Sequence, residues 1–190
     1  MNALTDNALM LQVKAGRMDI MGLLFERYHR PLFGFLFHMT NRREASEDML
    51  QTVFYRMLKY RHTFTGEGEF RSWMYHLART VLVDDRKHHQ RSQQQDELAG
   101  VADRISDGPA PDERLQKAQE MDTLQQAMAK LSTENREVLV LSRFQELKYE
   151  EIARVLNTTE GAVKVRVHRA MNELKKIYRT IDNETTAQNL

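Results

Sequence analysis

Apolar residues recur at three- and four-residue spacing through most of this chain, and the period is clearest over residues 149–178. A short polar run at 157–159 divides that stretch. Short polar side chains compete for backbone hydrogen bonds and therefore favour turns and helix caps. The apolar residues of the second part are Val163, Val167, Ala170, Met171, Leu174 and Ile177. The pattern predicts two helices joined by a tight turn, with one buried face on the second helix.

The other face of this second helix is basic. Its cationic residues are Lys164, Arg166, Arg169, Lys175, Lys176 and Arg179. Two helices joined by a tight turn, with a basic second helix, form the helix-turn-helix geometry that places side chains in the major groove of DNA. Many unrelated regulators carry such a pair, so the motif alone indicates DNA binding and nothing narrower.

The helical period stops at residues 92–114 and then returns. This segment is rich in Gln and in acidic residues, and it holds Gly108-Pro109-Ala110-Pro111. Such composition is typical of a linker that is partly extended or disordered. Strand patterns are absent, so we predict an all-α chain: two small helical domains, at 1–91 and 115–181, joined by a flexible linker, with a frayed tail at 182–190.

Residue types also predict where the helices of the first domain begin and end. The candidate N-terminal caps are Thr5 or Asp6 for the first helix, Asp19 for the second and Asn41 for the third. Pro31 lies inside the apolar pattern of the second helix and is expected to kink or split it. Residues 63–69 contain two glycines and no apolar period, which predicts a loop before the next helix.

Composition excludes several classes of protein. The 190 residues include no cysteine, so disulfides, thiolate zinc sites and cysteine nucleophiles are ruled out. No apolar signal segment follows the N-terminus, and the longest nearly apolar run, at 31–37, is too short to span a bilayer, so we expect a cytoplasmic protein without membrane insertion. The net charge is only +1, but it averages an acidic run at 94–113 and the basic second helix. Local patches determine the field at a phosphate backbone.

Four blocks of sequence, in order, resemble one known family. They read LLFERYHRPLFGFL, EDMLQTVFYRMLKY, FRSWMYHLARTVLVDDRK and LSTENREVLVLSRFQELKYEEIARVLNTTEGAVKVRVHRAMNELKK. Together they resemble the extracytoplasmic-function (ECF) group of bacterial sigma factors, the smallest members of the sigma-70 family. The resemblance implies an alternative sigma factor: a dissociable subunit that binds core RNA polymerase, directs promoter-specific initiation and aids DNA opening. It further implies that the first domain binds the polymerase clamp and the minus-10 element, and the second domain the minus-35 element and the polymerase flap.

The resemblance also implies three sets of site residues. For the minus-35 element these are Thr158, Thr159, Lys164, Val165, Arg166 and Arg169. For the minus-10 element, read as a flipped base in the 65–71 loop and an opened strand along the following helix, they are Thr65, Phe70, Arg71, Arg79, Thr80, Val83, Arg86 and Lys87. For the polymerase clamp they are Asp48, Gln51 and Thr52. Trp73 could stack on a base, but its helical spacing with Leu77 and Val81 favours a role in the core.

One position departs from the family pattern. Lys148 stands where Ser or Thr usually caps the first helix of the pair. Lysine has no acceptor for the capping bond, so the change is expected to destabilise the helix start by about 1 kcal/mol unless another residue compensates.

The same residues bear on other classes of function. His88 and His89 follow Asp84 and Asp85, but adjacent helical side chains point about 100° apart, and neither an HExxH pattern nor a phosphate-binding loop occurs. We therefore expect no enzyme activity, metal or cofactor. A stand-alone regulator that binds an operator without polymerase remains the alternative to a sigma factor. The resemblance further implies an anti-sigma factor as a partner.

Overall fold

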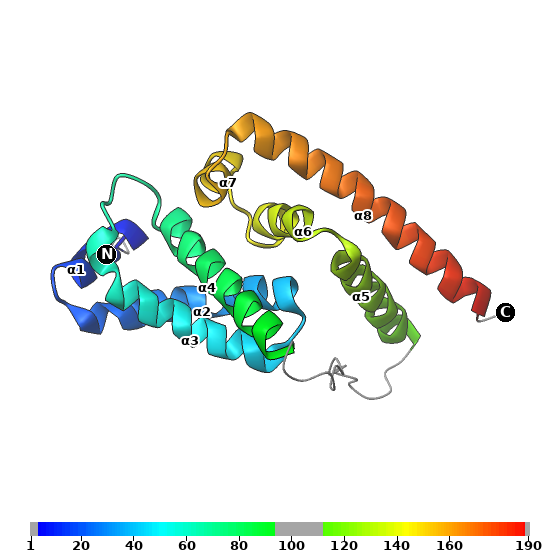
Figure 1. The fold of residues 1–190 in the computed structure, drawn as a ribbon, viewed down its shortest axis with the longest axis horizontal. Helices are drawn as coiled ribbons and strands as arrows, with labels where there is room; N and C mark the ends of the chain where they lie inside the picture. Colours follow the sequence, from blue (N-terminus) through cyan, green and yellow to red (C-terminus); the bar gives the residue numbers. More distant parts are fainter. Residues whose placement is uncertain (1–3, 94–111, 189–190) are drawn as a thin grey trace.

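The computed structural model describes residues 4–93 and 112–188, and all regular structure within them is helical (Figure 1). The first domain contains α1 (Asp6–Lys14), α2 (Met21–Thr40), α3 (Arg43–Lys59) and α4 (Phe70–Gln93), with short 3₁₀ turns η1 (Met18–Ile20) and η2 (Arg61–Thr63). The second contains α5 (Asp112–Lys130), α6 (Thr133–Leu139), the π-helical stretch η3 (Val140–Phe144), α7 (Tyr149–Leu156) and α8 (Glu160–Gln188). The all-α prediction is confirmed. The predicted linker at 92–114 falls mostly outside the described residues; α4 ends at Gln93 and α5 begins at Asp112.

The core of the first domain is built from the apolar faces of α2, α3 and α4, with α1 packed across one end. Its fully buried members include Leu9, Met10, Leu32, Phe35, Leu36, Val53, Met57, Met74 and Ala78. Removal of such side chains from water is the main force that holds the helices together. Trp73 packs against this core beside the rings of Phe64 and Phe70, as its spacing predicted.

The helix ends confirm one predicted cap and correct two. Thr5 Oγ1 accepts from the Ala8 amide at 3.2 Å, so Thr5 caps α1. Asp19 does not cap α2: it lies within η1 and pairs with Arg17. Asn41 does not cap α3: it ends α2 in the left-handed conformation, with φ 55°, which asparagine tolerates better than most residues.

Pro31 does not split the second helix. α2 runs through it without a break, although proline removes one backbone donor. Helices tolerate an interior proline when packing outweighs the lost bond, and α2 buries Leu24, Leu32 and Phe35 around this position. The long α2 therefore reaches from α1 to the second domain.

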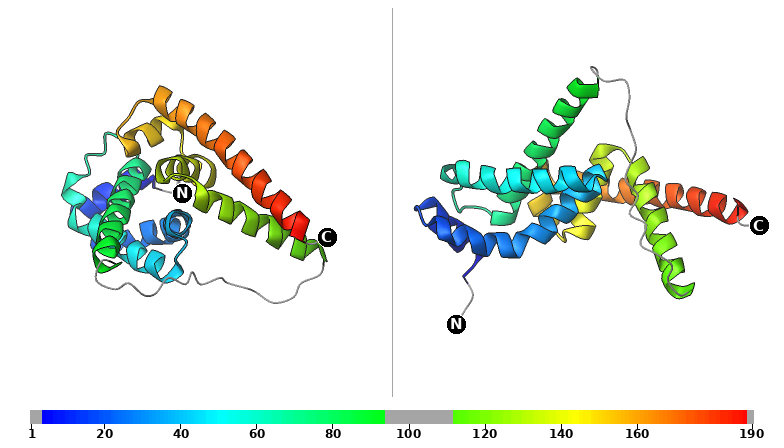
Figure 2. Two further views of the ribbon diagram at one scale, coloured as in Figure 1. Left: turned by 45° about the vertical axis from the view of Figure 1, so that its right-hand side comes forward. Right: turned by 90° about the horizontal axis from the view of Figure 1, so that it is seen from below.

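The second domain packs α5, α6 and α7 against α8. Ser132 caps α6, because its Oγ accepts from the Asn135 amide at 3.3 Å. α6 passes directly into η3, so the helical path continues from Thr133 to Phe144 with a change from α to π geometry. α8 continues to Gln188, beyond residue 182 where the sequence predicted fraying. The far half of α8 projects away from the first domain (Figure 2).

The two domains contact each other through α2 and α4 on one side and α6, η3 and α7 on the other (Figures 1 and 2). The buried apolar residues of both domains form one continuous cluster. Polar contacts join them as well; Arg136 Nη1, for example, donates to the Met39 carbonyl at 3.2 Å. We call this packing the closed arrangement. None of the described helices is both long and apolar enough to cross a membrane.

Candidate nucleic-acid interface

The two helices of the predicted helix-turn-helix are α7 and α8. Lys148 precedes α7 and makes no side-chain capping bond, but Glu151 Oε2 accepts from the Lys148 amide at 2.8 Å and restores half of a capping box. Asn157 ends α7 in the left-handed conformation, with φ 51°. Thr159 Oγ1 then accepts from the Ala162 amide at 3.2 Å at the start of α8. The missing cap is therefore compensated, and the turn is defined by side chains that suit it.

α8 presents a buried face and an exposed face, as predicted. Val163, Val167 and Ala170 are buried. The exposed face begins with Thr158 and Thr159 and continues along the helix with Lys164, Val165, His168 and Arg169. Val165 is 50% exposed and lies between the cationic residues of this face.

Two residues modify the predicted minus-35 set. Arg166 is half-buried, and its Nη2 lies 3.8 Å from Glu134 Oε2, so this guanidinium turns toward the start of α6. His168 is exposed one helical turn after Lys164 and lies on the same face. Sequence reasoning missed it, although the four-residue spacing from Lys164 was a sufficient signal.

The residues predicted to bind the minus-10 element divide into exposed and buried groups. Thr65, Thr80, Val83 and Lys87 are exposed, and the last three follow one stripe of α4 at spacings of three and four. Phe70 is only 1% exposed and packs against Tyr28 and Phe64, so its ring is not available to stack on a base in this arrangement.

Two arginines of this set contact the second domain. Arg71 donates through Nη2 to the Gln145 carbonyl and lies 4.0 Å from Glu151. Arg79 Nε donates to Glu137 Oε1 at 3.0 Å. Burial raises the pKa of Glu137, although the charge and hydrogen bond of Arg79 act in the opposite direction. Arg86 is half-buried. In the closed arrangement Arg71 and Arg79 are thus paired with groups of the second domain.

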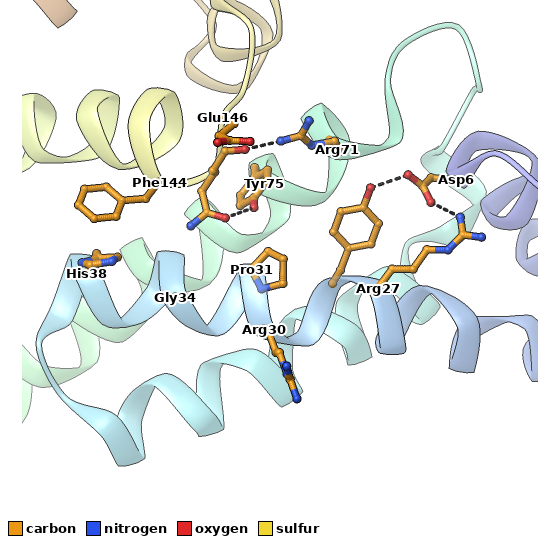
Figure 3. Close-up of a pocket in the computed structure, with 12 residues that line it drawn as sticks. Asp6, Arg27, Arg30, Pro31, Gly34, His38, Arg71, Tyr75, Phe144 and Glu146 are labelled. Carbon is orange, nitrogen blue, oxygen red and sulfur yellow. Dashed lines mark hydrogen bonds and ion pairs between the residues drawn. The ribbon is translucent and has the colours of Figure 1, made fainter. Parts of the chain in front are cut away.

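A groove of about 680 Å³ runs between the domains (Figure 3). Tyr75 Oη donates to Gln145 Oε1 at 2.7 Å, and both residues are buried. The His38 and Phe144 rings pack at a centroid distance of 4.1 Å. Burial lowers the pKa of His38 and raises that of Tyr75. Sequence reasoning did not single out Gln145, the residue that contacts both Arg71 and Tyr75.

The predicted polymerase surface lies on α3. Asp48 and Gln51 are exposed, whereas Thr52 is half-buried and donates its hydroxyl to the Asp48 carbonyl at 2.9 Å. Thr52 can therefore accept a hydrogen bond from a partner but has already used its donor. Within the described part of the chain, no three His, Asp or Glu side chains gather where they could hold a metal ion.

These features define a class: an all-helical, two-domain protein with a helix-turn-helix at one end and a second exposed stripe on α4, formed by Thr80, Val83 and Lys87. Comparison with known families is more specific. The family model described as "Sigma-70 region 2" matches residues 24–92, and that described as "Sigma-70, region 4" matches residues 121–174. The chain belongs to the sigma-70 family and, within it, to the ECF sigma factors.

Individual relatives agree with this assignment. The chain is 31% identical over 157 residues to RNA polymerase sigma factor YlaC of Bacillus subtilis, covering 80% of this chain and 88% of YlaC. It is 30% identical over 159 residues to ECF RNA polymerase sigma factor SigX of the same organism, covering 81% of each.

Solved structures share the fold. The structure described as CnrH in complex with the cytosolic domain of CnrY matches with a TM-score of 0.69 at 21% identity, over 92% of this chain and 97% of that one. The sigma factor RpoE from Bartonella quintana, solved with the anti-sigma factor NepR, matches with a TM-score of 0.68 at 18% identity, over 83% of this chain and 96% of that one.

The family membership decides between the functions weighed on the sequence. The protein is an alternative sigma factor, a transcription initiation factor that works with core RNA polymerase and promoter DNA, rather than a stand-alone regulator. Sigma factors are not enzymes, and their contribution to transcription is made by binding alone.

Proposed function

We propose that this sigma factor grips a promoter at two points, with α7 and α8 on the minus-35 element and with the 64–69 loop and α4 on the minus-10 element. The observation that carries the proposal is the exposed face of α8, where cationic side chains and Val165 stand outward over a fully buried apolar face. The DNA backbone attracts the cations regardless of sequence, while contacts to base edges provide selectivity.

At the minus-35 element, Lys164 and Arg169 are the residues best suited to guanine edges or phosphates. Val165 can pack on a thymine methyl group, which an exposed apolar side chain in the major groove does well. Thr159 uses its hydroxyl oxygen as an acceptor to cap α8, so its proton stays available for a phosphate at the helix N-terminus, with Thr158 beside it. Arg166 would contribute less to DNA binding, because its guanidinium is already paired with the Glu134 carboxylate at the margin of this face.

At the minus-10 element, the exposed loop residues Thr65, Glu67 and Glu69 are the candidates to meet a flipped base, and Thr80, Val83 and Lys87 to follow the opened strand. Phe70 supports the loop from within the core. Arg71 and Arg79 are released from their partners once the second domain moves away from α4, and the half-buried Arg86 extends the same helix toward the strand. Promoter binding therefore requires the closed arrangement to open.

Binding to core polymerase would hold the two domains apart. Asp48 and Gln51, with Thr52 as an acceptor, offer α3 as the surface for the polymerase clamp. Holding both domains on one large partner makes the second DNA contact intramolecular, so each DNA site can be weak alone.

The protein acts in the cytoplasm, where polymerase and promoters meet. The fold shared with sigma factors solved with anti-sigma partners supports regulation by an anti-sigma factor as well.

The test is in vitro transcription with bacterial core polymerase on a template library in which both promoter elements are randomised. Arg169→Ala should reduce base preference at minus-35 positions, with a loss of about 1–3 kcal/mol or a reduction of about 1 in the salt slope, and should leave core binding intact. Arg179→Ala is the matched control, since it removes the same charge about 15 Å further along the helix.

Two results would contradict the proposal. Loss of core binding by folded Arg169→Ala would show that the DNA and polymerase functions are divided differently. Tight binding of a DNA site by the free chain, with no association with core, would show that the two-point grip is wrong.

A further inference from the structure

The first helix of the chain packs directly on the loop assigned above to the minus-10 element. α1 (Asp6–Lys14) precedes the region that the sigma-70 region 2 family model matches, which begins at residue 24. Its buried face, formed by Leu9, Met10 and Val13, anchors it in the core. A second face points elsewhere, and the residues on it are Asn7, Leu11 and Lys14, spaced by four and three.

This second face contacts the loop at its two ends and in its middle. At one end, Lys14 Nζ donates to the Phe64 carbonyl at 2.6 Å. In the middle, the Leu11 side chain lies over Gly66, where an added Cβ would come within 3.4 Å of both Leu11 methyl carbons. Gly66 has a φ of +82°, a conformation that suits glycine and few other residues.

At the other end, one side chain makes two bonds. Asn7 Nδ2 donates to the Gly68 carbonyl at 2.8 Å, and Asn7 Oδ1 accepts from the Phe70 amide at 2.7 Å. The Phe70 amide belongs to the first turn of α4, so Asn7 acts as a helix cap from a distant part of the sequence. The side-chain amide of Asn7 therefore fixes both the last part of the loop and the start of α4, the helix proposed to face DNA.

Buried and exposed residues alternate along the loop and into the start of α4, from residue 64 to residue 70. Phe64, Gly66, Gly68 and Phe70 are the buried or half-buried positions toward α1 and the core. Thr65, Glu67 and Glu69, between them, are exposed. Contacts from α1 thus go to the even-numbered residues, and the odd-numbered side chains face outward. Thr65 Oγ1 accepts from the Glu67 amide at 3.3 Å and keeps its hydroxyl proton for a base.

We propose that α1 is the support that sets the conformation of the 64–69 loop, and that Asn7 and Lys14 are positioning residues for minus-10 recognition. Neither needs to touch DNA. They hold the loop so that Thr65, Glu67 and Glu69 stand outward at fixed spacing, and a loop fixed before binding loses less conformational entropy when a base enters. This inference rests on the proposed use of the loop for the minus-10 element.

The design of the test follows from the two bonds of Asn7. Asn7→Asp keeps the acceptor for the Phe70 amide, and so keeps the cap of α4, but loses the donor to the Gly68 carbonyl. The carboxylate oxygen that replaces Nδ2 then faces the Gly68 carbonyl oxygen, so thermal unfolding is measured first and should show a folded chain whose stability is reduced by about one hydrogen bond. Lys14→Met keeps the apolar stem and removes the donor at the opposite end of the loop. Gln12→Ala is the control on the same helix, since the Gln12 side chain contacts Arg17 and not the loop.

Each variant is assembled with core polymerase and transcribed from the template library with both promoter elements randomised. In Asn7→Asp and Lys14→Met, preference for the best base over the worst at minus-10 positions should fall roughly threefold to tenfold, the effect of one lost hydrogen bond. Preference at minus-35 positions should not change, and Gln12→Ala should behave as the unmodified chain.

The outcomes separate this inference from the function on which it rests. If the unmodified chain has no base preference at minus-10 positions, the assignment of the loop is wrong. If it has such a preference and both stable variants retain it in full, α1 is only a structural helix and the inference is overturned. A fall in preference at both promoter elements would likewise overturn it, because the hydrogen bonds of Asn7 and Lys14 go to the loop and to the start of α4.

Discussion

The buried hydrogen bond between Tyr75 and Gln145 is the contact through which the closed arrangement is most directly tested. Tyr75 is 1% exposed and Gln145 is 8% exposed, and the 2.7 Å bond joins α4 to the segment after η3. Tyr75→Phe retains the ring and its edge contact with Phe35 while removing the hydroxyl. Gln145 Oε1 is then left buried without its donor.

The expected magnitude follows from that loss. A buried polar atom without a partner costs about 1–3 kcal/mol, whereas replacement of both partners by apolar groups of similar shape is nearly neutral. Tyr75→Phe should therefore shift the ratio of closed to open molecules by about fivefold to 140-fold toward open. The double variant Tyr75→Phe with Gln145→Met should recover most of the closed population, which yields the coupling energy of a double-mutant cycle.

The absence of cysteine makes the assay simple. Cysteines introduced in place of Glu44 on α3 and Lys175 on α8, both exposed, can carry a fluorophore pair that reports the distance between the domains. Tyr28→Phe is the control, because Tyr28 donates to Asp6 within the first domain. It should lower the stability of that domain without opening the molecule.

The reasoning would be refuted by an energy-transfer distribution that Tyr75→Phe leaves unchanged while the first domain remains folded. It would also be refuted if Tyr75→Phe and Gln145→Met were strictly additive, since additivity would mean that the two groups do not act on each other across the interface.

Two further predictions concern a helix cap and a titrating side chain. Ser132→Ala removes the cap of α6 and should lower the free energy of unfolding by about 1 kcal/mol, measured by urea denaturation. His38 has a lowered pKa because it is buried against Phe144, so the closed arrangement favours neutral imidazole. The contribution of neutral His38 to the stability of the closed arrangement should be fully present above about pH 6.5, the pKa of histidine in the unfolded chain. It should be lost as the pH falls through the lower pKa of His38 in the folded protein. Energy transfer measured from pH 7.5 to 5.5 should decrease, and His38→Leu should lose that response.

Much of the fold could be predicted from the sequence because helical periodicity is a local signal. The apolar set Val163, Val167 and Ala170 identified the buried face of α8, and the polar break at 157–159 located the turn. The cap predictions fared less well. Asn41 lies where one helix ends and another begins within two residues, and asparagine suits both a cap and a left-handed terminus, so its residue type could not decide between them.

The domain interface could not be predicted in the same way. Arg71 and Arg79 contact residues 58 to 80 positions further along the chain, and periodicity carries no information about such distant pairs. Gln145 has no pattern that marks it as buried, since glutamine is usually exposed. The role of α1 was hidden for a related reason: Asn7 and Lys14 look like solvent-facing positions of an ordinary helix until the loop is folded against them.

The interface has consequences for how easily the molecule opens. The ion pairs of Arg71 and Arg79 join arginine side chains that are 32% and 40% exposed to carboxylates that are only 8% exposed. The cost of removing those carboxylates from water offsets much of the attraction, so the net contribution of the pairs to the closed arrangement is small. The buried bond between Tyr75 and Gln145 contributes more, and the shared apolar cluster adds to it.

If opening costs only a few kcal/mol, binding to a large polymerase surface readily supplies that free energy, because a partner that prefers one state by about 5.5 kcal/mol inverts a 99 to 1 equilibrium. Phosphates would then compete for the same two arginines that Gln145, Glu137 and Glu151 hold in the closed arrangement. DNA and polymerase would thus favour the open molecule together, and the interface would discourage promoter binding by the chain alone.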